Sequence, residues 1–252
     1  MIEVKNIIKS FDGTEILHDI SAKFYNGKIN QIIGPSGSGK TVFMKSIIGL
    51  YRVDSGTICY DGRNIASMNL KEIKLLRREV GSLFQGSALF DYLSVLENVM
   101  FPMRMFSNLT VQEMETQAKL CLQRVNMPER SYYLAPDEIS GGMQKRVAIA
   151  RAIALNPKYL FCDEPNSGLD PSTSLVIDAL IKEITEEKDI TTIVNTHDMN
   201  SILETNGHIN MIYKGNLVWS GTNEEIYQTD NEEVNNLVFA SDLFKRIKSI
   251  HS

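Results

Sequence analysis

One short stretch constrains the fold of this chain more than any other. It fits the pattern Gly-x-x-x-x-Gly-Lys-Ser/Thr at every fixed position, and it consists of Gly34, Pro35, Ser36, Gly37, Ser38, Gly39, Lys40 and Thr41. The residues before it, 29–33, are typical of a buried strand, and those after it, 42–50, are typical of a helix. A strand, a glycine-rich loop and a helix in this order predict a phosphate-binding loop.

The residue types in this loop suit a phosphate group. Glycines let successive backbone amides turn inward, and the start of the following helix adds partial positive charge beneath them. We expect Lys40 to reach the β- and γ-phosphates of a nucleotide and the Thr41 hydroxyl to bind Mg²⁺. The alternative is a glycine-rich turn that binds nothing, and the flanking strand and helix disfavour it.

The composition is that of a globular protein with a full core. The chain has 252 residues, of which 43% are hydrophobic and 23% charged, which fits one large α/β domain with room for a subdomain. The net charge of −5 argues against a nucleic-acid partner. No apolar run reaches the length of a membrane span, residues 1–5 are typical of a strand rather than a signal peptide, and three scattered cysteines fit reduced thiols.

Short apolar runs separated by turn residues predict strands. The expected strands are 2–8, 16–24, 29–33, 57–60, 80–84, 159–165, 191–195, 209–213 and 217–219. Residues from about 86 to 155 break this pattern and predict helices only, with apolar residues such as Phe90, Phe101 and Met105. These residues fit either a groove for a partner helix or the subdomain's own core. An acidic tract, 223–236, precedes a last helix that would dock on its own domain or on a partner.

Three residues are candidates because of their positions beside the strands. Gln85 and His197 each follow an expected strand, and ligands bind at the carboxyl ends of parallel strands. His197 is predicted to contact a phosphate, whereas a lone Gln is often an ordinary loop residue. Phe11 is expected in the first turn, where its ring would stack on an adenine, a contact worth about 1–3 kcal/mol, or belong to the core or turn.

Two adjacent carboxylates, Asp163 and Glu164, follow the apolar residues 159–162. Asp163 would hold Mg²⁺ through its water shell, and Glu164 is the natural base for an attacking water. The alternative is that the two carboxylates only keep the end of the strand soluble. The phosphate-binding loop earlier in the chain disfavours this alternative.

Two expected helix starts add further candidates. Ser140, Gly141 and Gly142 open a helix and form either a second cup for an anion or a simple N-cap with a flexible lead-in. Asp170 is predicted to cap the helix that ends near Lys188.

Taken in order, these residues resemble the ATP-binding subunit of an ABC transporter. The matching motifs are Walker A at 34–41, the Q-loop at Gln85, the signature at Ser140-Gly141-Gly142, Walker B with the catalytic glutamate at 159–164, the D-loop at 167–170 and the switch histidine at His197. The resemblance implies an α/β P-loop NTPase fold with a RecA-like core, an antiparallel β subdomain and a helical subdomain. The implied boundaries are 1–222 for the nucleotide-binding domain, about 87–155 for its helical subdomain and 223–252 for a C-terminal helical extension.

The resemblance also implies a mechanism. Two copies of the chain would enclose two ATP molecules head to tail, with Mg²⁺ held by Thr41, Gln85 and Asp163. Glu164, His197 and Gln85 would serve catalysis. The nucleotide contacts would come from Phe11, the loop 34–41, Asp170 and, across the dimer, Ser140, Gly141 and Gly142. ATP would close the homodimer and hydrolysis would open it, and an integral membrane permease would use that motion.

Departures from the commonest signature narrow the resemblance. Ile139 and Met143 replace its Leu and Gln, and together with residues 83–90 and 97–99 they resemble the Mla-type phospholipid-trafficking subfamily. This implies a lipid cargo, the cytoplasmic face of the inner membrane, a mammalian-cell-entry-domain lipid-binding protein and a small STAS-type regulator. The alternatives are another cargo, a soluble ABC-type ATPase that remodels a macromolecular complex, and a P-loop kinase, which would leave the signature and His197 without a role.

Overall fold

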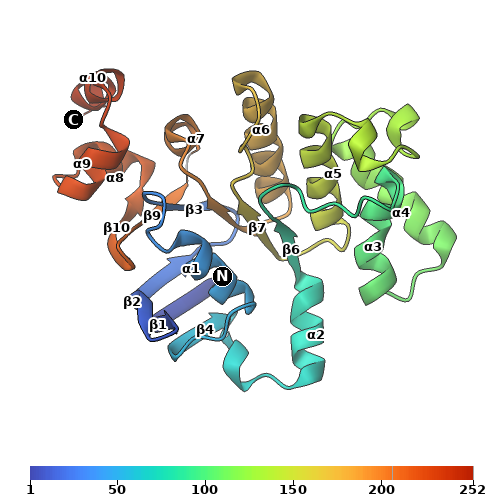
Figure 1. The fold of residues 1–252 in the computed structure, drawn as a ribbon, viewed down its shortest axis with the longest axis horizontal. Coiled ribbons are helices and arrows are strands. Elements are labelled where there is room, and N and C mark those ends of the chain that lie inside the picture. The colour runs from blue at the N-terminus through green and yellow to red at the C-terminus, as the bar shows by residue number, and fades with distance from the viewer. Residues whose placement is uncertain (206, 252) are drawn as a thin grey trace. The chain divides into compact units, whose positions relative to one another are not determined.

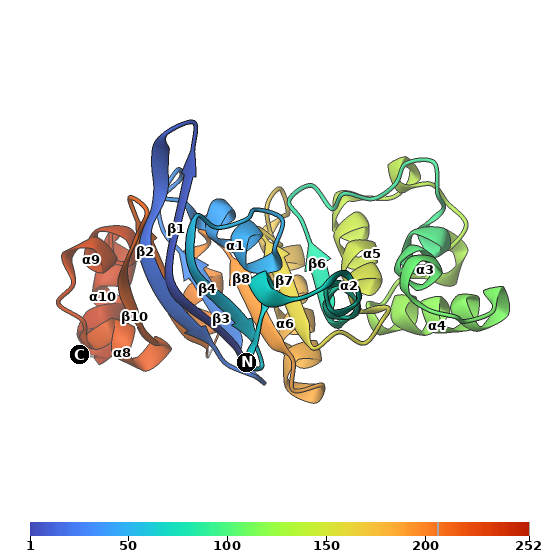
Figure 2. The same cartoon turned by 90° about the horizontal axis from the view of Figure 1, so that it is seen from below.

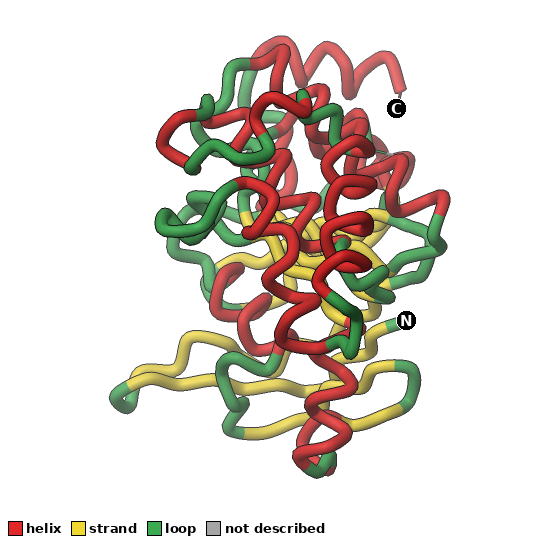
Figure 3. Tube along the Cα trace, turned by 90° about the vertical axis from the view of Figure 1, so that its right-hand side faces the viewer, coloured by secondary structure: helices red, strands yellow, loops and turns green. Residues whose placement is uncertain are grey.

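The described part of the chain forms two compact units. The computed structural model describes residues 1–205 and 207–251. Met1–Met68 and Thr191–Ser252 form one unit and Asn69–Ile190 form the other. We call them the terminal unit and the middle unit. The chain combines helices and strands (Figure 3), and no helix among the described residues is long and apolar enough to cross a membrane.

An antiparallel sheet begins the terminal unit. It consists of β1 (Ile2–Phe11), β2 (Thr14–Phe24), β4 (Ser55–Tyr60) and β5 (Arg63–Asn64), in the order β2-β1-β4-β5 (Figures 1 and 2). The expected position of Phe11 in the first turn is wrong, because Phe11 is the last residue of β1 and pairs with Thr14. Asp12 and Gly13 alone take the left-handed conformations that the tight turn requires, with φ of 49° and 79°.

Four further strands of the terminal unit include β3, which leads directly into the phosphate-binding loop. β3 (Ile29–Ile33) lies between β8 (Thr191–Asn195) and β9 (His208–Tyr213) and is parallel to both, while β10 (Asn216–Thr222) is antiparallel to β9. Every residue of β3 and β8 is buried, as in parallel strands covered on both faces. α1 (Lys40–Ile48) follows β3, and α7 (Met199–Glu204) follows β8. The loop and His197 therefore follow the carboxyl ends of neighbouring strands.

The C-terminal residues fold back onto the terminal unit. The acidic tract 223–236 contains α8 (Asn223–Gln228) and most of α9 (Glu232–Val238), and α10 (Asp242–His251) follows. Ile226, Val234 and Val238 join Ile33 in one buried cluster, against which Phe244 of α10 packs. Of the two alternatives for the last helix, the structure shows docking on its own unit, and α8, α9 and α10 lie beside β10 (Figures 1 and 2).

The middle unit combines two parallel strands with helices. β6 (Val80–Leu83) pairs with β7 (Tyr159–Asp163), and α2 (Leu70–Glu79) and α6 (Pro171–Glu187) precede and follow them. Between the strands lie α3 (Val95–Phe106), α4 (Val111–Arg124), the 3₁₀ turns Glu129–Ser131 and Pro136–Glu138, and α5 (Gly141–Ile153). The expectation of helices only from about 86 to 155 is confirmed, because no strand occurs in this fully described stretch.

The apolar residues of the helical stretch divide between core and surface. Met103 is fully buried, Phe90 and Phe101 are half-buried, and Tyr92 and Met105 are exposed. The Phe90 ring contacts those of Tyr92 and Phe101, with centroids 5.7 and 4.5 Å away. We call Phe90, Tyr92 and Phe101 the aromatic patch.

Candidate functional site

The phosphate-binding loop has the backbone that its glycines predict. Gly34, Gly37 and Gly39 have φ of 151°, 77° and 105°, in the region that favours glycine. A β-carbon on Gly34 would lie 2.1 Å from the carbonyl oxygen of Ile212 on β9, so this position excludes every other residue. Gly39 is the N-cap of α1, and it places the first turn of that helix directly after the loop.

Two side chains of the loop indicate a binding site for an anion. The buried Lys40 ammonium donates hydrogen bonds to the carbonyl oxygens of Gly34 and Pro35, at 2.8 and 3.0 Å, and so closes the loop on itself. The buried Ser38 Oγ has no hydrogen-bond partner among the residues that the structure describes. A buried hydroxyl without a partner is costly, and a phosphate oxygen would satisfy it.

The end of β8 lies close to the loop. Asn195, which is buried, donates from Nδ2 to the exposed Thr41 hydroxyl at 3.5 Å. His197 follows two residues later and is exposed. Asn195 was not predicted from the sequence, although an amide side chain at the end of a fully buried strand is itself a signal of a polar role.

Phe11 keeps part of its ring available. It is 38% exposed, and its ring packs edge-on against Tyr51, with centroids 5.2 Å apart and an interplanar angle of 77°. The Lys9 ammonium lies 4.9 Å from the centroid of the same ring. Tyr51, which follows the end of α1, was not predicted from the sequence, because nothing local connects it with Phe11.

In the middle unit, the two predicted carboxylates lie at the end of β7. The strand ends at Asp163, earlier than the expected 165, because Glu164 has a left-handed backbone with φ of 51°. Asp163 is buried and Glu164 is half-buried.

A buried lysine on α5 lies next to these carboxylates. Lys145 Nζ donates to the backbone carbonyl of Glu164 at 3.4 Å. Burial lowers the pKa of this lysine, while the nearby Cys162, Glu164 and Asp163 act in the opposite direction. Burial also raises the pKa of the Cys162 thiol to about 12, so this cysteine stays protonated at neutral pH. Periodicity alone would have placed an apolar residue at position 145.

The starts of α5 and α6 are close together within the middle unit. Ser140 Oγ accepts from the Met143 amide at 3.3 Å, so Ser140 is the N-cap of α5, and the anion cup stays a prediction. A β-carbon on Gly142 would lie 2.9 Å from the Thr173 side chain. Asp170 caps α6 as predicted: its carboxylate accepts from the Ser172 hydroxyl, at 2.5 Å, and from the Thr173 hydroxyl and amide. These hydrogen bonds hold the pKa of Asp170 well below its usual range.

Gln85 is exposed and lies two residues beyond β6. The predicted residues thus divide between the two units. The terminal unit carries Phe11, the loop 34–41 and His197, and the middle unit carries Gln85, the signature residues 140–142, Asp163, Glu164 and Asp170.

The residues expected at Mg²⁺ carry donor atoms of the type that this ion prefers. In the described residues, no group of three or more His, Cys, Asp or Glu side chains could hold a metal ion. The residues expected at Mg²⁺ are the Thr41 hydroxyl, the Gln85 amide and the Asp163 carboxylate, which are oxygen donors. Mg²⁺ prefers few protein oxygens together with water and phosphate, so this sparse set fits a nucleotide-bound ion.

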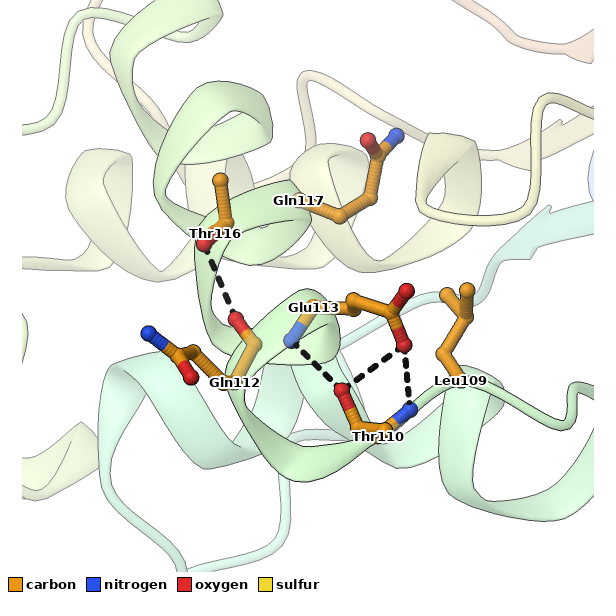
Figure 4. Close-up of a pocket in the computed structure, with 6 residues that line it drawn as sticks. All are labelled: Leu109, Thr110, Gln112, Glu113, Thr116 and Gln117. Carbon is orange, nitrogen blue, oxygen red and sulfur yellow. Dashed lines mark hydrogen bonds between the residues drawn. The ribbon is translucent and has the colours of Figure 1, made fainter.

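A pocket at the start of α4 has another origin (Figure 4). Thr110 and Glu113 form a capping box there, with Thr110 N donating to Glu113 Oε2 at 2.7 Å. Leu109, Gln112, Thr116 and Gln117 complete the lining. None of the predicted site residues lines this pocket.

Comparison with known proteins decides the family. The sequence profile described as ABC transporter matches residues 17–167, which is more than half of the chain. The chain belongs to the ABC transporter family. It carries the ATPase cassette of that family, as the ordered motifs predict, and the P-loop NTPase fold is confirmed.

The relatives of this ABC cassette differ in their named cargo. A protein of Mycobacterium leprae, named as a probable ribonucleotide transport ATP-binding protein, is 37% identical over 92% of this chain, which spans 67% of that protein. The intermembrane phospholipid transport ATP-binding protein MlaF of Haemophilus influenzae is 36% identical over 93% of this chain and 88% of its own length. The cassette MJ0796 in a dimeric post-hydrolysis state with ADP and Pi is 30% identical, with a TM-score of 0.81 over 88% of this chain and 98% of that chain.

Proposed function

We propose that this chain binds Mg²⁺ and ATP and hydrolyses ATP as one half of a homodimer that drives a membrane transporter. We also propose that the cargo is a phospholipid or a related lipid. The alternative cargo is the ribonucleotide named for the mycobacterial relative. The family supports the first statement, and the second depends on narrower similarities.

The phosphate-binding loop is the observation that carries the ATPase proposal. The loop holds its shape through glycine conformations and through the hydrogen bonds of Lys40 to its own carbonyls. When ATP binds, Lys40 would exchange these carbonyls for β- and γ-phosphate oxygens, and Ser38 would gain a partner. Because the loop is already formed, little ordering would oppose binding.

The remaining residues would serve the phosphoryl transfer. Thr41, Gln85 and Asp163 would hold Mg²⁺, which neutralises charge on the phosphates when bound. Glu164 would accept the proton of the attacking water, and His197 would contact the γ-phosphate. Gln85 would add to the alignment of the reactants. A loose phosphoryl transition state needs position and charge rather than a covalent intermediate, and these side chains supply both.

The homodimer would complete the site. Ser140 and Gly141 are exposed at the start of α5, where backbone amides and the helix dipole favour an anion. In a head-to-tail pair, these residues and Gly142 would contact the γ-phosphate held by the other copy. Support comes from MJ0796, which forms a dimer.

The membrane subunit would contact the aromatic patch. Tyr92 is 78% exposed, and the half-buried Phe90 ring contacts both the Tyr92 ring and the half-buried Phe101 ring. An apolar surface of this kind suits a helix of an integral membrane permease. The ATPase would then lie on the cytoplasmic face of the inner membrane.

The lipid cargo is supported by the relative MlaF and by the signature residues Ile139 and Met143. A mammalian-cell-entry-domain lipid-binding protein and a small STAS-type regulator would be further components of such a system.

Co-purification tests this proposal. Tagged Glu164→Gln protein, expressed in its native cells and purified from gently solubilised membranes, should carry a permease, a mammalian-cell-entry-domain protein and bound phospholipid. Lys40→Ala is the matched control for nucleotide-dependent components. A permease without lipid would overturn the cargo, and purely soluble partners would favour the remodelling ATPase.

A further inference from the structure

The segment directly after Gln85 has an unfavourable backbone. Gly86, Ser87 and Ala88 are three consecutive residues in the left-handed region, with φ of 79°, 65° and 46°. Ser87 and Ala88 carry β-carbons, which disfavour this conformation. Such a segment persists only where surrounding groups hold it.

The holding group is Arg151 on α5. Its Nη1 donates to the Ala88 carbonyl at 2.8 Å, and its Nη2 donates to the Ser87 carbonyl at 2.9 Å. Its guanidinium also lies 5.7 Å from the centroid of the Phe90 ring. The planar fork of arginine matches two adjacent carbonyls, which a lysine cannot do with the same geometry. Burial lowers the pKa of Arg151, but an arginine remains charged at neutral pH.

Asn98 on α3 extends the same network to the aromatic patch. Its Oδ1 accepts from the Phe90 amide at 2.9 Å, and its Nδ2 donates to the Phe90 carbonyl at 3.1 Å. Arg151 Nη1 lies 3.5 Å from the same Oδ1. Asn98 is fully buried and Arg151 is half-buried, and both side chains bind the backbone of residues 87–90.

Arg151 lies at the opposite end of α5 from the signature residues. The helix begins after Ser140, and Arg151 lies about 16 Å further along its axis. One end of a rigid helix therefore carries the signature, and the other end carries the fork that holds residues 86–88. Gln85 immediately precedes this segment, and the aromatic patch begins immediately after it.

We propose that Arg151 is a positioning residue that makes residues 86–90, and with them the aromatic patch, follow the movements of the signature helix α5. Engagement of the signature by ATP would reach the partner surface through Arg151, which holds residues 87 and 88 directly. The inference rests on the proposed function, because only a nucleotide that contacts the signature would move α5.

Hydrogen exchange on the full chain tests this proposal. In a Glu164→Gln parent, Mg²⁺ and ATP should slow exchange both in the loop 34–41 and in residues 86–93. Arg151→Ala should speed exchange of residues 86–93 by about tenfold without ATP, because two charge-assisted hydrogen bonds are lost. It should also abolish the ATP-dependent slowing there, while slowing at 34–41 persists.

Two further variants make the result decisive. Arg146→Ala removes another arginine of α5, which donates to the Asn126 carbonyl at 3.4 Å, and it should leave residues 86–93 unchanged. Arg151→Lys keeps the charge but not the planar fork, and it should still lose most of the ATP response at residues 86–93. This variant can be measured even if Arg151→Ala does not fold.

The outcomes separate the two proposals. An ATP response at 86–93 that survives in both Arg151 variants would overturn the positioning role, as would a parent that binds ATP without any response at 86–93. A parent that shows no ATP binding by calorimetry would instead overturn the proposed function. Faster exchange throughout α5 and β6 in Arg151→Lys, with the ATP response at 86–93 intact, would reduce Arg151 to a structural residue.

Discussion

The phosphate-binding loop and the segment after Gln85 are both short stretches of left-handed backbone, but they are held in opposite ways. In the loop, all three left-handed positions are glycines, and Lys40 bonds to carbonyls of the loop itself. In the segment, Ser87 and Ala88 take the same conformation at a cost of about 1–2 kcal/mol each. There the support comes from Arg151, more than sixty residues further along the chain.

The loop is therefore held by residues of its own motif, whereas the segment after Gln85 is held by a residue of a distant helix. The loop is held by its own glycines and by Lys40, which suits a phosphate cup that must be ready before ATP arrives. The segment keeps its shape only while Arg151 is in place, which suits a surface whose position has to report on another site. A binding loop that is held by its own residues is thus ready for its ligand, whereas a segment that is held by a remote residue can respond to a change at another site.

The largest expected effect is a loss of ATP turnover, and it tests the hydrolysis on which both regions would depend. Glu164→Gln removes the predicted base, and turnover should fall by about 10²–10⁴-fold while ATP affinity is retained. Steady-state phosphate release and calorimetry measure the two quantities. Light scattering should show a closed dimer that persists with ATP, because the pair cannot reopen through hydrolysis.

Glu186→Gln is the control, since Glu186 is an exposed carboxylate on α6 and should leave turnover unchanged. Near-normal hydrolysis in Glu164→Gln would refute the assignment of the base.

Lys40→Ala tests the locally encoded region directly. The variant loses the ammonium that closes the loop, and ATP affinity should fall on the order of 10²-fold, because charge-assisted hydrogen bonds to phosphate are removed. Calorimetry with Lys23→Ala as control measures it, since Lys23 is exposed and bonds to Glu3. Unchanged affinity in Lys40→Ala would mean that the loop does not bind the nucleotide.

Gly34→Ala and Gly37→Ala show how local the loop is. Gly37 needs glycine only for its own φ, since nothing lies within 4 Å of an added β-carbon, and its substitution should cost about 1 kcal/mol of unfolding free energy. Gly34 also meets the Ile212 carbonyl, so its substitution should cost about 2–4 kcal/mol. Urea unfolding measures both. Equal losses would show that β9 does not restrict the loop.

The sequence predicted what is encoded locally. It predicted the buried strand before the loop, the cap at Asp170 and the helical stretch from about 86 to 155, and it offered a cap as one of two interpretations of Ser140, because each depends on neighbouring residues. Motif order also predicted the family. The positions of His197 and Gln85 after strands are confirmed, while their roles remain predictions.

The sequence did not predict the residues that act across long separations. Asn195, Tyr51, Lys145 and Arg151 each reach a candidate site residue or its neighbours from a distant part of the chain. Nothing in the residues next to them signals the partner. The resemblance implied a helical extension over 223–252, but the residues themselves did not locate α8 and α9 within it, because their polar composition resembles a loop and their few apolar residues pack only against the core of the terminal unit.

Phe11 lies between the two cases in the comparison, and its substitution should have the smallest effect on ATP binding. Its candidacy came from its position ahead of the loop, but its ring is held by Tyr51, which is remote in sequence. If adenine stacks on the exposed part of the ring, Phe11→Ala should weaken ATP binding about tenfold. Tyr51→Ala should weaken it only about threefold, since it removes the support and leaves the stacking surface.

Tyr25→Ala is the matched control, because Tyr25 is also 38% exposed and packs edge-on against His208, with centroids 5.0 Å apart. Calorimetry with ATP and with triphosphate alone separates the base from the phosphates. A loss that is equal for both ligands would assign Phe11 to the fold of the β1–β2 hairpin rather than to adenine. A loss in Tyr51→Ala as large as in Phe11→Ala would show that remote support, and not the position in the motif, decides this contact.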